Sequence, residues 1–124
     1  MTLAVEVRAN VHISGLDRGE LEAVFFGMGD VLSDIEDEMP EVLDHAVSVD
    51  LGRKRVTIEV TAKGSTVEEA DTLAKAAVLM AMKATGGAPA SAEHLRQFAL
   101  SGSSVVEELA ANDVIVESNE LVLH

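Results

Sequence analysis

Residues 3–14 read LAVEVRANVHIS, and apolar and polar side chains alternate through almost the whole stretch. The odd-numbered positions up to residue 13 are apolar, whereas the even-numbered positions after Ala4 are polar. Because successive side chains of a β-strand point to opposite faces of a sheet, this alternation predicts a strand with one apolar and one polar face. Such a strand needs neighbours to satisfy its backbone hydrogen-bonding groups and a layer that covers its apolar face. We therefore looked for further strands and for covering helices in the residues that follow.

A long helix is predicted between Asp17 and Pro40. Asp17 and Glu20 have the spacing of a capping box, and a proline stops a helix because it lacks the backbone N–H. Gly27 and Gly29 lie inside the predicted helix, which indicates either the close approach of a neighbouring backbone or a bend. Apolar residues recur at steps of three and four and form one stripe, which should face the sheet: Leu21, Val24, Phe25, Met28, Leu32, Ile35 and Met39.

A hairpin and a second helix should come next. Residues 43–51 and 56–62 alternate in the same way as the first strand, with a turn predicted at 52–54. The second helix is expected to begin at Ser65 or Thr66 and to stop at the glycine pair 86–87. Its inner stripe consists mostly of small residues, so helix and sheet can approach closely: Ala70, Leu73, Ala74, Ala77, Met80, Ala81 and Ala84.

The predicted order up to residue 87 is strand, helix, strand, strand, helix. This order resembles the ferredoxin-like arrangement, in which both helices cover one face of an antiparallel sheet and the first and third strands pair at its centre. A fourth strand would flank the first. We therefore predict an α+β protein with a ferredoxin-like βαββα sandwich. The resemblance is architectural, and it assigns no functional residue.

Residues 88–124 are expected to form an appended C-terminal segment that packs on the core domain of residues 1–87, giving one domain overall. Two short helices are predicted first. Apolar residues 114–116 and 121–123 then flank Ser118 and Asn119, which indicates a short strand or a small hairpin. The sequence leaves open whether this segment covers its own core or that of another subunit.

The composition excludes several classes of site. The chain has 124 residues, a formal net charge of −13 and no cysteine. Such a charge repels nucleic-acid phosphates and anionic lipids, so neither nucleic-acid nor membrane binding is expected. The absence of cysteine excludes disulfides and thiolate metal sites. The first residues lack the basic and apolar regions of a signal peptide, so we expect a cytoplasmic protein.

No known catalytic motif is present: the sequence has no glycine-rich phosphate loop, no GxSxG and no HExxH. We therefore expect a protein without a cofactor, and a binding protein rather than an enzyme. His45 should be a partly buried core residue. On the polar face of the sheet, Arg8, His12 and Arg55 are candidate ligand-binding residues, and this face carries the alternative hypothesis of a small-ligand binding or regulatory domain.

The leading hypothesis is a non-enzymatic protein-interaction or assembly module. It rests on apolar residues predicted to point outward from the helices: Phe26 on the first helix, and Leu79 and Met82 on the second. The competing interpretation is that the C-terminal segment folds back over these residues. A homodimer is expected from the Ala/Met-rich second helix, from the outward Phe26 and, if the C-terminal segment does not pair there, from an exposed edge of the first strand.

Acidic residues gather towards the end of the first helix, where negative charge opposes the helix dipole. Asp30, Asp34 and Asp37 lie at steps of four and three, which places their carboxylates on one helix face. A solvated face explains this pattern most simply. The alternatives are a divalent-metal site, for which these three residues are weak candidates, and a docking face for a basic protein partner.

Overall fold

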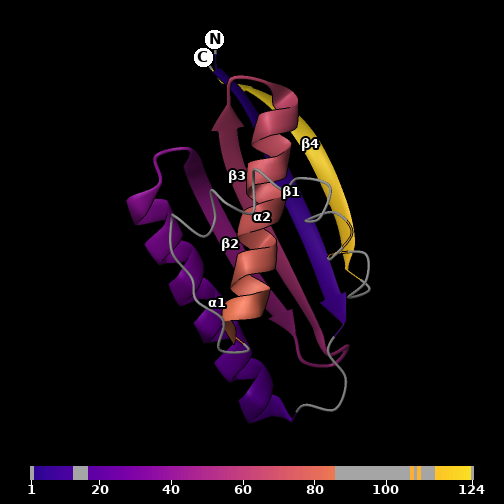
Figure 1. Cartoon of the computed structure of the whole chain (residues 1–124). Helices are drawn as coiled ribbons and strands as arrows, with labels where there is room; N and C mark the ends of the chain where they lie inside the picture. Colours follow the sequence, from indigo (N-terminus) through magenta and orange to yellow (C-terminus); the bar gives the residue numbers. More distant parts are fainter. Residues whose placement is uncertain (1, 13–16, 86–106, 108, 110–113, 124) are drawn as a thin grey trace.

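The computed structural model describes residues 2–12, 17–85, 107, 109 and 114–123. Along the chain the elements are β1 (Thr2–His12), α1 (Arg18–Glu38), β2 (Val42–Asp50), β3 (Arg55–Gly64), α2 (Val67–Thr85) and β4 (Ile115–Leu123). The four strands form one antiparallel sheet in the order β2-β3-β1-β4. Both helices lie on the same face of this sheet (Figure 1). The predicted α+β fold with an antiparallel sheet and two covering helices is confirmed, and its element order is ferredoxin-like.

β1 lies inside the sheet, as its long alternation predicts. It pairs with β3 on one side and with β4 on the other, so that Val7 faces both Val60 and Ser118 in register. Its apolar face is buried beneath the helices: Val5, Val7, Ala9 and Val11. Burial of each valine stabilises the fold by about 1.5–3 kcal/mol.

α1 begins and ends where the sequence predicts. The Asp17 carboxylate accepts the Glu20 N–H at 2.8 Å, and the Glu20 carboxylate accepts the Asp17 N–H at 3.3 Å, which completes the capping box. At the C-terminal end of α1, the Met39 N–H donates a hydrogen bond to the Ile35 carbonyl at 2.8 Å. At Gly29 an added Cβ would meet no atom within 4 Å, so the predicted close approach of a neighbouring backbone is wrong at that position.

The β2–β3 hairpin turns at the predicted place but departs from the predicted alternation at its start. Two residues of β2, Val42 and Leu43, lie opposite Ala62 alone, which is a β-bulge. The bulge brings Val42 into the core at 2 % exposure, whereas Leu43, which we expected on the apolar face, is only partly buried. The alternation then continues as expected through His45, Val47 and Val49.

α2 is more deeply buried than its inner stripe predicts. Thr66 caps the helix by accepting the Glu69 N–H at 3.1 Å. α2 packs against β3, β1 and α1, and this burial extends beyond the predicted stripe to Ala76, Val78 and Leu79. Leu79 is 2 % exposed and Met82 is partly buried, so neither is an exposed apolar residue of the described structure. The competing interpretation, that the C-terminal segment covers them, concerns residues 88–113, most of which lie outside the described residues.

α2 comes very close to the end of β3 at Gly64. A Cβ added at Gly64 would lie 2.9 Å from the Ala70 backbone nitrogen, a distance that real side chains do not adopt. Glycine is therefore required there by the close approach of α2.

β4 is a single strand of nine residues, and the predicted alternative of a small hairpin is wrong. Ser118 and Asn119, which we placed at the turn, lie in mid-strand and pair with β1 like their neighbours. Of the helical segment expected in residues 88–113, the structure describes Glu107 and Leu109, both helical. Neither α1 nor α2, the helices of the described chain, has the length and hydropathy to cross a bilayer.

Candidate functional site

A pocket of about 250 Å³ lies between α1 and the outer strand β2, and we call it the α1–β2 pocket. It contains an aromatic wall, a carboxylate, a hydroxyl and an imidazole. Five of its lining residues come from successive turns of α1 and three from β2: Phe25, Phe26, Gly29, Asp30, Ser33, His45, Ala46 and Val47.

Phe26 stands at the mouth of this pocket with 64 % of its surface exposed. Its ring meets that of Phe25 edge to face, with centroids 5.2 Å apart. Phe25 is itself half-buried and lines the same pocket, so the two rings form one aromatic wall. Among the described residues, Phe26 and Ile115 are the large apolar side chains that remain exposed, and the predicted outward position of Phe26 agrees with this geometry.

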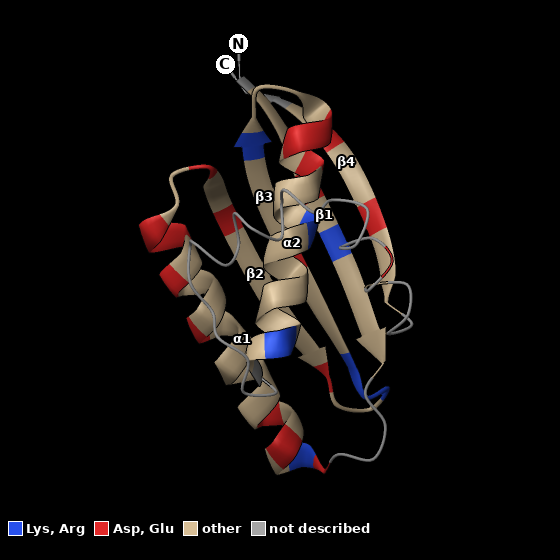
Figure 2. Ribbon diagram, viewed as in Figure 1, with Lys and Arg blue, Asp and Glu red and all other residues tan. Residues whose placement is uncertain are grey.

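α1 is rich in acidic residues, and Figure 2 shows their positions towards both ends of the helix. The exposed ones include Glu22, Asp30, Asp34 and Asp37. Arg18, at the first turn, bonds Glu22 at 3.4 Å, while the last turn of α1 contains no basic residue. We call this surface of α1, together with the pocket, the α1–β2 face. Its charge favours a cationic ligand.

His45 connects the two elements that form the pocket. Its Nδ1 contacts the Glu36 carboxylate, its Nε2 lies 3.3 Å from the Ser33 hydroxyl, and its side chain is 20 % exposed. Sequence reasoning placed His45 on the apolar side but missed both partners. Ser33 and Glu36 are three residues apart on a helix and therefore share a face, which is the signal that could have identified them.

An acid, an imidazole and a hydroxyl in line are the groups that activate a serine in hydrolases. Catalysis of acyl transfer also needs donors that stabilise the oxyanion. Ser33 lies inside α1, where the neighbouring backbone N–H groups already bond carbonyls of the preceding turn. The described residues therefore provide no donor pair beside its hydroxyl. The arrangement instead fastens α1 to β2 and fixes one wall of the pocket.

The ligand-binding candidates of the polar sheet face do not converge on a cavity in the described part of the chain. His12 lies opposite Arg55 in the register of β1 and β3, whereas Arg8 lies farther along β1 and bonds Glu59 at 2.9 Å. Both described pockets are lined by other residues.

The weak metal candidates are also dispersed. Asp30, Asp34 and Asp37 are all exposed on α1. Within the described ranges, no group of three or more His, Asp or Glu side chains is arranged to hold a metal ion.

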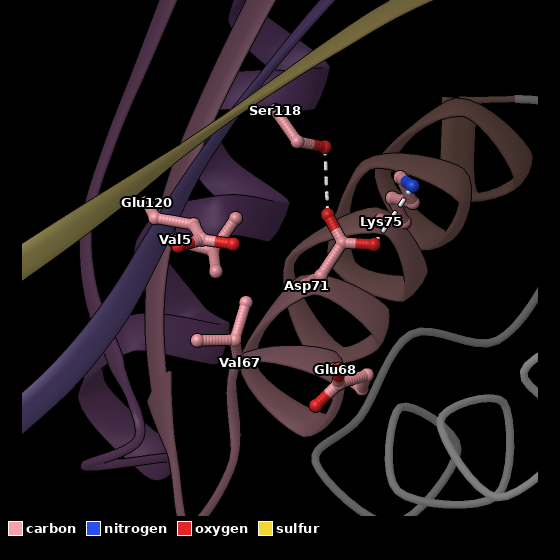
Figure 3. Close-up of a pocket in the computed structure, with 7 residues that line it drawn as sticks. All are labelled: Val5, Val67, Glu68, Asp71, Lys75, Ser118 and Glu120. Atoms are coloured by element: carbon pink, nitrogen blue, oxygen red, sulfur yellow. Dashed lines mark hydrogen bonds and ion pairs between the residues drawn. The ribbon is translucent and has the colours of Figure 1, made fainter.

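A second pocket, of about 270 Å³, lies between α2 and the β1–β4 part of the sheet. Figure 3 shows Ser118 and Lys75 meeting at Asp71. The Ser118 hydroxyl donates to Asp71 at 2.6 Å, and the Lys75 ammonium donates to the other carboxylate oxygen at 2.8 Å. The Asp71 and Lys75 side chains are 25 % and 20 % exposed, so this ion pair is partly shielded from water. The contacts of this pocket join β4 to α2.

Comparison with known proteins gives no family. No protein-family model and no curated protein matches the chain. A crystal structure from Caulobacter crescentus, described as a "putative antibiotic biosynthesis monooxygenase", is 13 % identical with a TM-score of 0.49, over 98 % of this chain and 92 % of that one. The de novo designed protein Foldit4 is 12 % identical with a TM-score of 0.38 over the whole of both chains. Likenesses this distant carry no argument about activity.

Proposed function

We propose that this protein is an interaction module that binds a basic, amphipathic segment of a partner protein on the α1–β2 face. The observation that carries the proposal is the position of Phe26, which is 64 % exposed, lines a pocket together with Asp30 and lies one helical turn after Glu22.

The apolar part of the site suits an anchor residue of the partner. Interfaces commonly derive most of their affinity from a few aromatic or apolar side chains that fill pockets near the centre of the contact. Phe26 supplies such a ring, Phe25 holds it in place, and the pocket beside it has room for one aliphatic side chain of the partner.

The charged part of the site suits lysine or arginine on either side of that anchor. Glu22 lies one turn before Phe26 and Asp30 one turn after it, so both carboxylates flank the ring on one helix face. Complementary charge speeds association and rejects acidic competitors more than it adds affinity. A partner helix with basic residues around a leucine would match this order of groups.

The competing hypothesis, ligand binding on the polar face of the sheet, has no comparable support. Arg8 already pairs with Glu59, and the described pockets lie elsewhere. Glu36, His45 and Ser33 position α1 on β2 and are not proposed as catalytic residues, because the described residues provide no oxyanion-stabilising donors beside the Ser33 hydroxyl.

The test uses a synthetic amphipathic peptide of lysine and leucine, with a second peptide in which serine replaces every leucine at the same charge. Titration followed by NMR should shift the signals of the α1–β2 face with the first peptide only. Phe26→Ala should weaken binding about tenfold, the loss of one hot-spot contact. Ile115→Ala is the matched control, because Ile115 is equally exposed (67 %) but lies on β4.

Two results would overturn the proposal. Equal binding of the leucine and serine peptides would leave only non-specific attraction between a basic peptide and an acidic protein. Equal weakening by Phe26→Ala and Ile115→Ala would remove the anchor from α1.

A further inference from the structure

The two ends of the sheet differ in how far their outer edges are protected. β2 carries a bulge at its start and packs against α1. β4 pairs with β1 over nine consecutive positions without a bulge, and no described strand lies beyond it (Figure 1). A regular strand with unpaired N–H and C=O groups on one side is a template for another strand.

We infer that β4 pairs with β4 of a second copy of this chain, antiparallel and with Asn119 on the twofold axis. The two sheets then form one continuous sheet with the helices of both copies on the same face. This dimer is independent of the α1–β2 face, which lies at the opposite end of the sheet order.

The sequence of β4, IVESNELVL, is close to a palindrome in its chemistry. With Asn119 on the axis, every residue of the strand has a partner in the second copy. The pairs are Ile115 with Leu123, Val116 with Val122, Glu117 with Leu121 and Ser118 with Glu120. Apolar residue types are opposite each other at both ends of the strand, and the two Asn119 amides can bond each other because each carries donors and an acceptor. The Ser118 hydroxyl keeps its bond to Asp71 and contributes nothing to this pairing.

Neighbouring registers are worse. In a continuous antiparallel sheet, two residues that lie opposite each other point to the same face. Because faces alternate along the strand, paired positions of the two copies must both be odd or both be even, so the twofold axis passes through a residue and not between two residues. An axis at Glu117 or at Glu120 would place identical carboxylates directly opposite each other, which destabilises a strand pair. An axis at Ser118 would leave Val122 and Leu123 without partners. The two glutamates therefore select the Asn119 register.

The exposure of Ile115 supports the same partner. This side chain is 67 % exposed, and it lies on the face of the sheet opposite to the helices because it pairs with Asn10. In the register of the dimer, Ile115 is paired with position 123 of the second copy. An exposed aliphatic side chain near the end of an edge strand that no other described strand covers would thereby be removed from water.

The test places a single cysteine in a chain that has none. In Asn119→Cys the two Cα atoms on the axis would be about 4.5–5.5 Å apart, within the range of a disulfide. In Glu117→Cys the equivalent atoms are offset by four residues, roughly 13 Å, and cannot be bridged. Both positions are exposed on the same face. Mild oxidation should therefore cross-link Asn119→Cys and leave Glu117→Cys uncross-linked.

Sedimentation of the unmodified chain provides the second arm. A dimer should form with rising concentration and tighten with salt, because both copies carry a charge of −13. Ile115→Lys should weaken the dimer about tenfold. Ser48→Lys, which introduces a lysine on the other outer strand, β2, should leave dimerisation unaltered. A monomer at every concentration, or equal cross-linking of the two cysteine variants, overturns the proposal.

Discussion

His45 uses both ring nitrogens to connect α1 with β2, through Glu36 on one side and Ser33 on the other. The three residues show how far sequence reasoning reaches at the scale of a side chain. The caps at Asp17 and Thr66 were predictable because a cap and the backbone group it binds are three residues apart. The partners of His45 were not, because they depend on how a helix and a strand pack together.

We predict that Glu36→Ala lowers the free energy of unfolding by about 1–2 kcal/mol. The change leaves one nitrogen of a largely buried imidazole without its charged partner. Asp37→Ala, in the next position but exposed, is the control and should change stability by less than about 0.5 kcal/mol. Urea unfolding of both variants is the measurement. Equal effects would show that the contact with His45 contributes nothing specific.

At the scale of the element, β4 is the case in which local sequence was misleading. Its polar centre, from Glu117 to Glu120, has the composition of a turn between two short apolar runs. Pairing with β1 along nine positions satisfies more backbone groups than a hairpin with two three-residue strands could. The conformation of residues 115–123 is therefore determined by their non-local partner β1 and not by their local sequence. The other strands and both helices were predictable because their apolar periodicity continues through the whole element.

The contact between Asp71 and Ser118 should be the side-chain link that holds β4 against α2. We predict that Asp71→Ala lowers the free energy of unfolding by about 1–2 kcal/mol and speeds hydrogen exchange most in β4. Glu68→Ala is the control, since Glu68 is exposed on the rim of the same pocket: it should lose only the small favourable interaction with the dipole of α2 and leave hydrogen exchange in β4 unchanged. Exchange that increases equally in β2 and β4 would refute a local role for Asp71.

The charge of the whole molecule bears on its stability. A formal net charge of −13 destabilises a compact state through self-repulsion, and the carboxylates near the end of α1 add the unfavourable interaction with the helix dipole. The alternative was that basic residues of the hairpin turn neutralise this cluster. Arg53 in that turn instead lies 3.8 Å from Asp50, and the whole length of β2 separates the turn from the end of α1.

We therefore predict that the melting temperature rises with salt and that Asp34→Asn combined with Asp37→Asn stabilises the isolated chain. Screening and removal of charge relieve the same repulsion. Thermal melts of the unmodified chain and of the double variant at low and high ionic strength compare screening by salt with removal of charge. The control variant combines Glu68→Gln with Glu69→Gln. Those two acids lie in the first turn of α2, where the dipole favours them, so their removal should lower stability. A melting temperature that falls with salt would contradict the repulsion argument.

The position of β1 between β3 and β4 has a consequence for the order of folding. α1 and β2 separate β3 from β1 in the chain, and α2 and the segment after it separate β4 still further from β1. Closing the longer loop between β1 and β4 costs more conformational entropy than closing the loop between β1 and β3, so the β1–β4 pair should form later. During synthesis, β1 therefore keeps one unpaired edge until residues 115–123 follow, and for that interval the nascent chain depends on other protection against pairing with other chains.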